Sequence, residues 1–237
     1  MSTFPIVLRN IEYQIIKELG RGASGRVIKV LNKSDNKYYA IKEIETKDNK
    51  KEIIKEFENE VNILSKFYCN NIIKYYDSYR YAYKNKFCIL MEYCEGQNLK
   101  DFINKYRNKN ELIDDKILYT IIKKLCICIK EIHNKKIIHR DLKPENIFIN
   151  DNMDIKIGDF GISKLFSSNK AYYETKDKAW SIFYIAPEIL VKGIYNEKSD
   201  MYSLGCVIYE LFNLSIYYND REYEKIKKTD INKYNNK

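Results

Sequence analysis

Apolar positions along the chain follow two different periods. Between residues 13 and 93, short runs rich in Ile, Val and Tyr predict β-strands over 13–19, 27–31, 38–44, 72–79 and 87–93. The segment 51–66 differs, because Ile54, Phe57, Val61 and Leu64 recur at helical spacing with charged residues between them. We therefore expect one helix within an otherwise β-rich first part.

The pattern becomes helical from residue 99 onward. Helices are predicted over 99–107, 114–134 and 199–213, with short β-like runs at 147–149 and 155–157. The last segment, 214–237, is polar and rich in lysine, which fits a charged helix and a frayed tail equally well. These elements predict an α+β fold in which a β-rich lobe joins a helix-rich lobe near residues 92–98.

Composition narrows the class of protein. The chain has 237 residues, 45% of them hydrophobic, which is enough for a packed core, and we find no apolar run that could span a bilayer. The N-terminal residues lack the pattern of a signal peptide. The six cysteines form no Cys-x-x-Cys pair, so we expect reduced thiols in a cytoplasmic or nuclear, intracellular protein with no membrane partner.

The net charge of +9 raises the question of nucleic acid. Lysines alternate with acids, as in 47–52, and no basic stripe interleaved with aromatic residues is present. A solvated surface therefore explains the charge better than a nucleic-acid partner.

The strongest chemical motif is the string from His139 to Asn146, which places Asp141, Lys143 and Asn146 at fixed offsets and is followed by Asp159-Phe160-Gly161. Here the sequence resembles the eukaryotic protein kinases of the serine/threonine type. The resemblance implies that Asp141 orients and deprotonates the attacking hydroxyl, Lys143 holds phosphate charge, and Asn146 and Asp159 ligate Mg2+. It also makes His139 a packing residue beside Phe160 instead of the catalytic base.

Residues 20–27 have the spacing G-x-G-x-x-G-x-V. Alone, this motif would be an ordinary hairpin turn, and a dinucleotide-binding turn would require a following helix. A β-like run follows instead, which favours a flap over nucleotide phosphates. With the flanking leucine, the implied ATP-binding residues are Leu19, Gly20, Arg21, Gly22, Ala23, Ser24, Gly25, Arg26 and Val27.

Lys42 follows in the run Ala40-Ile41-Lys42. By the resemblance it contacts the α- and β-phosphates and pairs with a glutamate of the helix at 51–66, for which Glu60 is favoured over Glu58 and Glu56. For the adenine, the resemblance implies a gatekeeper at Met91, backbone hydrogen bonds from Glu92 and Cys94, and apolar contacts from Val27, Ala40 and Phe148. Asn98 completes this implied ATP-binding set.

Residues 183–188 resemble the end of a kinase activation segment. Arg140 is a candidate to bind a phosphate on that segment, with Thr175 as the first candidate acceptor and Ser181 behind it. Activation would then come from an upstream kinase or from autophosphorylation. Asp200, at the start of the helix 199–213, would anchor the backbone of the catalytic loop, and a helix N-terminal carboxylate is compatible with that role.

Together these motifs predict a protein kinase catalytic domain over 13–213, with an N-lobe over about 13–91, a hinge at about 92–98 and a C-lobe from 99. The C-lobe is expected to stop after its central helix, and 214–237 would be a tail or a partial C-lobe. The expected activity is transfer of the γ-phosphoryl group of ATP, with Mg2+, to a serine or threonine of a protein. The motifs are similar to NIMA-related kinases, and the alternative is a truncated nucleotide-binding, pseudokinase-like scaffold.

Overall fold

The computed structural model describes residues 6–22, 25–45, 51–67, 69–81, 86–160, 164–165, 182–192 and 195–216. The chain forms two compact units, Met1–Cys94 and Glu95–Lys237. The boundary between them falls inside the segment 92–98. The mixed α+β class expected from the sequence is confirmed, with a β-rich first unit and a helix-rich second unit.

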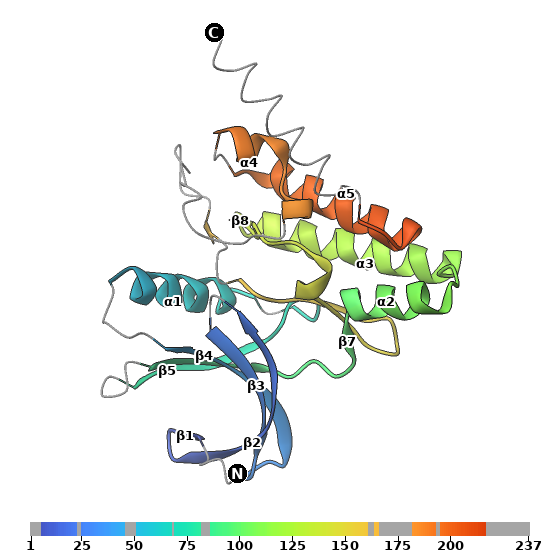
Figure 1. The fold of residues 1–237 in the computed structure, drawn as a ribbon. Helices are drawn as coiled ribbons and strands as arrows, with labels where there is room; N and C mark the ends of the chain where they lie inside the picture. Colours follow the sequence, from blue (N-terminus) through green and yellow to red (C-terminus); the bar gives the residue numbers. More distant parts are fainter. Residues whose placement is uncertain are drawn as a thin grey trace. The chain divides into compact units, whose positions relative to one another are not determined.

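The first unit is built on a six-stranded antiparallel sheet (Figure 1). Its strands are β1 (Ile6–Leu8), β2 (Ile11–Gly22), β3 (Gly25–Asn32), β4 (Lys37–Glu45), β5 (Tyr75–Tyr81) and β6 (Lys86–Glu92). Their spatial order is β1-β2-β3-β4-β6-β5, so all consecutive strands pair except β4 and β5, which β6 separates. Helix α1 (Lys51–Leu64) connects β4 towards β5 and lies beside the sheet in Figure 1.

Alternation along the strands explains where the core of this unit lies. On β3, Ile28 and Val30 are fully buried while their neighbours are half-buried, as expected when alternate side chains point to opposite faces. These two side chains belong to a buried cluster on one face of the sheet, whose other members are Leu8, Tyr13, Ile41, Cys88 and Leu90. The opposite face carries Lys42 and the apolar residues of the candidate site described below.

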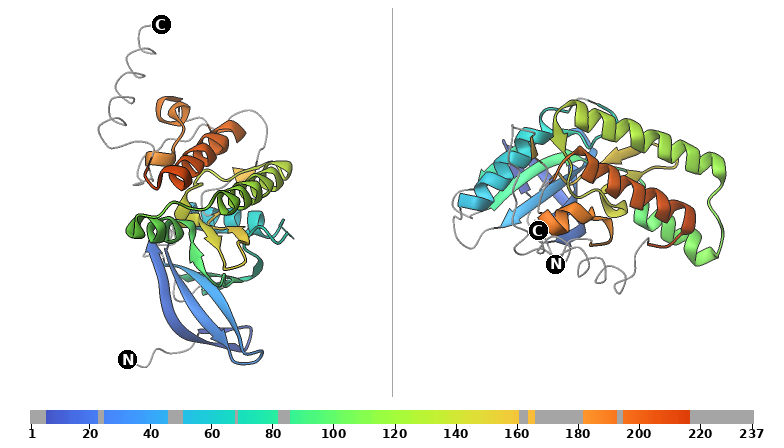
Figure 2. Two further views of the ribbon diagram at one scale, coloured as in Figure 1. Left: turned by 90° about the vertical axis from the view of Figure 1, so that its right-hand side faces the viewer. Right: turned by 90° about the horizontal axis from the view of Figure 1, so that it is seen from above.

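The second unit is mainly helical. Its helices are α2 (Leu99–Lys109), α3 (Asp115–Asn134), α4 (Pro187–Lys192) and α5 (Glu197–Asn213), with short 3-10 turns at Pro144–Asn146 and Ile182–Tyr184. Helices α3 and α5 run side by side, as Figure 2 shows. Two small sheets complete the unit: β10 (Ile155–Ile157), β9 (Ile147–Ile149) and β7 (Gln97–Asn98), and β11 (Lys164–Leu165) with β8 (Ile137–Ile138).

Local sequence accounts for the helix ends. Asn98, Asp114 and Asn196 are the N-caps of α2, α3 and α5, and each side chain accepts a hydrogen bond from a backbone N–H of the first turn. Asn196 and Ser199 form a reciprocal capping box at α5. Asn110 ends α2 in the left-handed conformation that asparagine tolerates.

The predicted strand over 72–79 is shifted in the structure, where β5 runs from Tyr75 to Tyr81. Ile72 and Ile73 are buried but precede the strand: Ile72 forms an isolated bridge and Ile73 belongs to no strand, so their apolar character reflects core packing. The sequence pattern did not predict β1, β7, β8, β11 or α4, which are all short. Thr175 and Ser181 lie outside the described residues, as do Ala23, Ser24 and most of 214–237.

Candidate active site

The first unit pairs a buried lysine with a buried glutamate. Lys42 on β4 and Glu60 on α1 are 4% and 2% exposed, and the Lys42 Nζ donates to both carboxylate oxygens at 2.7 and 3.0 Å. Glu56 and Glu58 lie on the exposed side of the same helix. The structure therefore brings together the residues of the favoured pair, although the role of that pair in binding phosphate stays a prediction.

The glycine-rich segment forms a hairpin. Its register pairs Gly20 with Val27, Arg21 with Arg26 and Gly22 with Gly25, so β2 and β3 stay paired up to the ends of both strands. Gly25 has a φ of +120°, and a Cβ at this position would lie 2.1 Å from the carbonyl oxygen of Glu43. Only glycine fits there, because both the backbone conformation and the close approach of β4 exclude a side chain.

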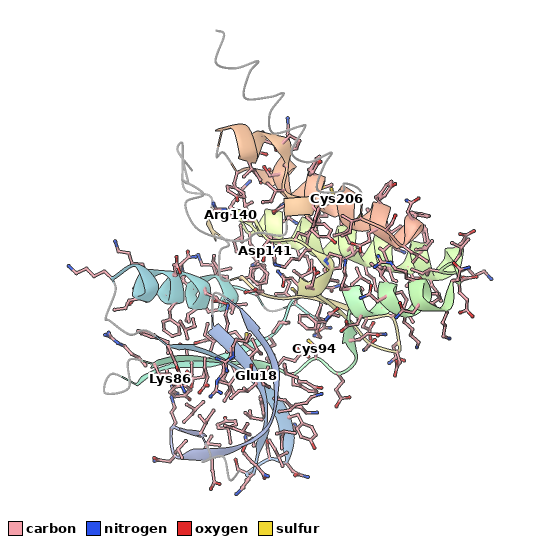
Figure 3. The ribbon with its side chains drawn as sticks, viewed as in Figure 1. Glu18, Lys86, Cys94, Arg140, Asp141 and Cys206 are labelled. Atoms are coloured by element: carbon pink, nitrogen blue, oxygen red, sulfur yellow. The ribbon has the colours of Figure 1, made fainter. Side chains whose placement is uncertain are left out.

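Ion pairs hold this hairpin to its neighbours. The buried carboxylate of Glu43 accepts from the Arg26 Nε at 2.6 Å and lies 2.9 Å from the Nζ of Lys86. On the exposed side, the Arg21 guanidinium bonds Glu18 at 2.8 Å and holds the pKa of that carboxyl below its ordinary value. Figure 3 labels Glu18 and Lys86. Glu43 was not predicted as a structural residue. The one signal in the sequence was its position directly after Lys42 in a strand.

One face of this sheet collects the predicted nucleotide residues. Residues directly opposite in an antiparallel sheet share a face, and the register places Val27 opposite Lys42, and Ala40 opposite Met91. Ala40 and Lys42 are two residues apart on β4, so all four side chains lie on the same face. An apolar surface next to a charged lysine is an arrangement that suits an aromatic base joined to phosphates.

The second unit contains the loop with the strongest sequence motif. The Lys143 Nζ lies 2.8 Å from the Oδ2 of Asp141, and the Asn146 Nδ2 donates to the same oxygen at 3.0 Å and to the backbone carbonyl of Asp141 at 2.8 Å. The other carboxylate oxygen of Asp141, Oδ1, accepts no hydrogen bond from the part of the chain that the structure describes. Two donors thus fix the orientation of the carboxylate while one oxygen remains available for a proton.

Asp200 on α5 shapes this loop, as the sequence predicted. Its carboxylate accepts from the backbone N–H groups of His139 and Arg140 at 2.8 and 2.9 Å, and it contacts the Nε2 of His133 at 2.9 Å. Arg140 has a φ of 72°, which is rare for a residue with a side chain, and the two backbone hydrogen bonds hold it there. The contact with His133 was not predicted. Figure 3 labels Arg140 and Asp141 on this loop.

His139 is a scaffold residue, and its predicted packing beside Phe160 is confirmed. Its ring is fully buried with its centroid 4.9 Å from that of Phe160. The Nδ1 accepts from the backbone N–H of Asp141, and the Nε2 lies 3.0 Å from the carbonyl of Gly158. A neutral ring with its proton on Nε2 satisfies both contacts.

The β9–β10 hairpin brings the two candidate metal ligands to one end of the loop. Ile147 pairs with Ile157, and the Gly158 N–H donates to the carbonyl of Asn146 at 2.9 Å, so Asp159 follows directly beyond that contact. Because its nitrogen is directed at Asp141, the Asn146 side chain can present its oxygen to a cation. Asp159 is exposed. A carboxylate and an amide oxygen are ligands that Mg2+ accepts together with substrate phosphates, so the residues fit the predicted metal.

Three further predicted residues, Asn98, Phe148 and Arg140, lie in the second unit and contact other parts of that unit. Asn98 caps α2, accepting from the Asp101 N–H at 2.8 Å, while Phe148 is half-buried on β9. The guanidinium of Arg140 lies 4.0 Å from the ring centroid of Tyr195, and burial lowers the pKa of this group. The roles of these residues in binding ATP or a phosphate stay predictions.

A buried carboxylate in α5 was missed altogether. Glu210 is fully buried and accepts from Lys100 at 2.7 Å, from Arg107 at 3.3 Å and from the hydroxyl of Tyr184. The network joins α2, α5 and the 3-10 turn at Ile182–Tyr184. The sequence pattern that could have revealed Glu210 is an acidic residue on an otherwise apolar helix face, between Val207 and Leu211.

Comparison with known proteins agrees with this geometry. The sequence model of the protein kinase domain matches residues 13–237. A probable serine/threonine-protein kinase nek2 from Dictyostelium discoideum is 36% identical over 207 residues, covering 86% of this chain and 49% of that protein. Human serine/threonine-protein kinase Nek2 is 32% identical over 205 residues (84% and 46%), and human Nek5 is 36% identical over 204 residues (86% and 28%).

The chain thus spans about half the length of these relatives, or less. In the part of the chain that the structure describes, no helix is long and apolar enough to cross a membrane. The match of the domain model over most of the chain, together with these serine/threonine-kinase relatives, shows that the chain belongs to the protein kinase family, of the serine/threonine type and similar to the NIMA-related (Nek) kinases.

Proposed function

We propose that this chain transfers the γ-phosphoryl group of ATP to serine or threonine hydroxyls of protein substrates. The observation that carries the proposal is the pair of donors on one oxygen of Asp141, which leaves the other carboxylate oxygen to receive a proton. The buried pair of Lys42 and Glu60 and the family membership support it.

In the proposed reaction, the Oδ1 of Asp141 accepts the proton of the attacking hydroxyl, and the hydrogen bonds from Lys143 and Asn146 keep the carboxylate in one orientation. Lys143 also brings a positive charge next to the place where phosphate charge develops. Lys42, fixed by Glu60, binds nucleotide phosphate from the first unit. Charge positioning of this kind accounts for most of the catalysis of phosphoryl transfer.

Asn146 and Asp159 are the residues that would hold Mg2+. When bound, Mg2+ neutralises charge on the phosphate oxygens during transfer. His139 contributes no proton, because its two ring nitrogens contact the backbone of Asp141 and of Gly158.

A phosphotransfer assay with Mg-ATP and a generic protein substrate tests the proposal. We expect Asp141→Asn to lower the rate by about 10²- to 10⁴-fold, the usual contribution of a positioned base. Asp151→Asn, which makes the same change at an exposed turn residue on the same unit, should retain the rate. Phosphoamino-acid analysis should find phosphoserine or phosphothreonine. Equal signals from the wild-type chain and Asp141→Asn would overturn the assignment in favour of a non-catalytic scaffold.

The partners follow from the proposed reaction: ATP, and proteins with accessible serine or threonine. We place the activity in the cytoplasm or nucleus, because the six cysteines are present as thiols, as expected for reducing compartments. Regulation through Thr175 or Ser181, by an upstream kinase or by autophosphorylation, is part of the proposal. Arg140 is the residue proposed to receive the phosphate.

A further inference from the structure

A lysine in the first unit is clamped between two tyrosines. The Nζ of Lys29 on β3 lies 3.8 Å from the ring centroid of Tyr38 and 4.1 Å from that of Tyr93. The two rings also meet edge to face, with centroids 6.3 Å apart. An ammonium group over two aromatic faces gains cation–π attraction from both.

The clamp lies on the face of the sheet that carries the candidate nucleotide residues. Lys29 is two residues from Val27 and stands opposite Ala40, while Tyr38 is two residues from Ala40 on β4. Strand alternation therefore places Lys29 and Tyr38 on the same face as Lys42. The clamp is thus a continuation of the candidate site along its own sheet.

Tyr93 connects the clamp to the backbone proposed to bind adenine. It lies between Glu92, the last residue of β6, and Cys94, which Figure 3 labels. The N–H of Glu92 is fixed by the carbonyl of Lys74 at 2.8 Å, so the strand end is held on one side. The ring of Tyr93 is held by Lys29 on the other. A residue whose side chain and preceding amide are both held loses less conformational freedom when a ligand binds beside it.

Building on the proposed function, we infer that Lys29, through Tyr38 and Tyr93, is a positioning residue for the adenine half of the nucleotide. The clamp preorganises the backbone of residues 92–94 and leaves the phosphate-binding residues unaffected. Its effect is therefore specific for nucleotides that carry a base, and absent for the phosphate chain alone.

Lys29 has a neighbour of like charge, Lys17, and this neighbour provides a control that distinguishes positioning of the nucleotide from a general effect on stability. The register places Lys17 on β2 opposite Lys29. Two lysines directly opposite each other repel, so removing either charge relieves that repulsion. Only removal of Lys29 also removes the tyrosine contacts, which makes Lys17→Met a matched control.

The test measures equilibrium binding of Mg-ADP and of Mg-tripolyphosphate to the purified chain. For Lys29→Met we expect a Kd for Mg-ADP that is roughly three- to tenfold higher, as expected for the loss of two partly exposed cation–π contacts, and an unaltered Kd for tripolyphosphate. Lys29→Arg should recover most of the ADP affinity, because a guanidinium also stacks on tyrosine. Lys17→Met should bind both probes as the wild-type chain does.

The outcomes separate this inference from the proposed function. If the wild-type chain binds neither probe, the proposed function fails and the inference fails with it. If the wild-type chain binds Mg-ADP and Lys29→Met binds it equally well, the inference alone is wrong. A matched loss of affinity for ADP and tripolyphosphate would also contradict it, since that result indicates a general disturbance of the sheet.

Discussion

The buried pair of Lys42 and Glu60 makes a sharp prediction at the scale of single residues. Removing one charge of a buried ion pair leaves the other uncompensated, so Lys42→Met and Glu60→Leu should each lower the free energy of unfolding by about 3–5 kcal/mol. The double variant Lys42→Met/Glu60→Leu should recover much of that stability, since apolar side chains can replace a buried pair. It should recover no phosphotransfer, because the charge that we propose to bind phosphate is gone.

Denaturant unfolding and activity assays on the four proteins check this prediction. A matched control is Lys33→Met, which breaks an exposed pair with Glu12 at 2.7 Å and should change the free energy of unfolding by less than about 1 kcal/mol. If the double variant is as unstable as the sum of the two single variants, the stability of the pair does not depend on charge compensation.

Candidate site residues could be picked out from sequence motifs, although their chemical roles stay predictions, and buried charges that depend on long-range packing could not be picked out. Asp141, Asn146 and Asp159 lie in recognisable strings, and the anchoring role of Asp200 followed from its place in such a string. Glu43 and Glu210 have no such context. Their buried carboxylates depend on cations from other elements, and nothing in a single sequence says that Lys86 meets Glu43 or that Lys100 meets Glu210.

At the scale of elements, two glycines of the β2–β3 hairpin should respond differently to the same change. Gly25→Ala forces a side chain into a left-handed backbone and to within 2.1 Å of the Glu43 carbonyl, so it should lower the free energy of unfolding by about 2 kcal/mol or more. At Gly20, a Cβ would meet nothing within 4 Å. Gly20→Ala therefore should leave stability nearly unchanged.

Thermal denaturation of the two variants beside the wild-type chain measures the difference. Equal melting temperatures for Gly25→Ala and Gly20→Ala would contradict the close approach of β3 to β4. The comparison also separates two requirements for glycine in one motif: the folded chain itself needs Gly25, whereas no neighbour requires glycine at position 20, whose role towards a ligand stays a prediction.

Elements with a strong period were predicted, and elements without one were missed. The helices at 99–109, 115–134 and 197–213 carry long apolar stripes, so their existence was evident and only their ends moved. Strands β7, β8 and β11 have two residues each, too few to show any alternation. They form because larger elements bring their backbones together, so the local sequence pattern does not predict them.

At the scale of the whole molecule, tyrosine ionisation should limit stability in alkali. Within the described part of the chain, the pKa of six tyrosines is raised, namely Tyr13, Tyr39, Tyr76, Tyr79, Tyr184 and Tyr195. Burial is the main cause at most of them, while at Tyr39 the hydrogen bond to Asp35 raises the pKa to about 12. A raised pKa in the folded state means that the unfolded chain loses its proton first. Stability is therefore full below pH 10 and falls as the pH rises from there towards 12.

Unfolding measured between neutral and strongly alkaline pH, with tyrosinate absorbance recorded in parallel, checks this expectation. Tyr39→Phe should weaken the pH dependence above pH 10, because the phenylalanine cannot ionise. Tyr119→Phe, at a tyrosine that is 68% exposed, should keep the wild-type dependence. A stability that is constant up to pH 12 would contradict the raised pKa values.

The carboxylate of Asp200 determines when, during synthesis of the chain, the loop at His139 and Arg140 can form its contacts with α5. The ribosome delivers Asp141, Asn146 and Asp159 well before α5, yet the amides of His139 and Arg140 find their acceptor some 60 residues later in the chain. Until α5 emerges, the backbone N–H of Arg140, which has a left-handed conformation in the folded chain, lacks the carboxylate that accepts from it there. A nascent chain therefore carries the residues of the candidate site before α5 supplies the carboxylate that accepts from two backbone N–H groups of their loop.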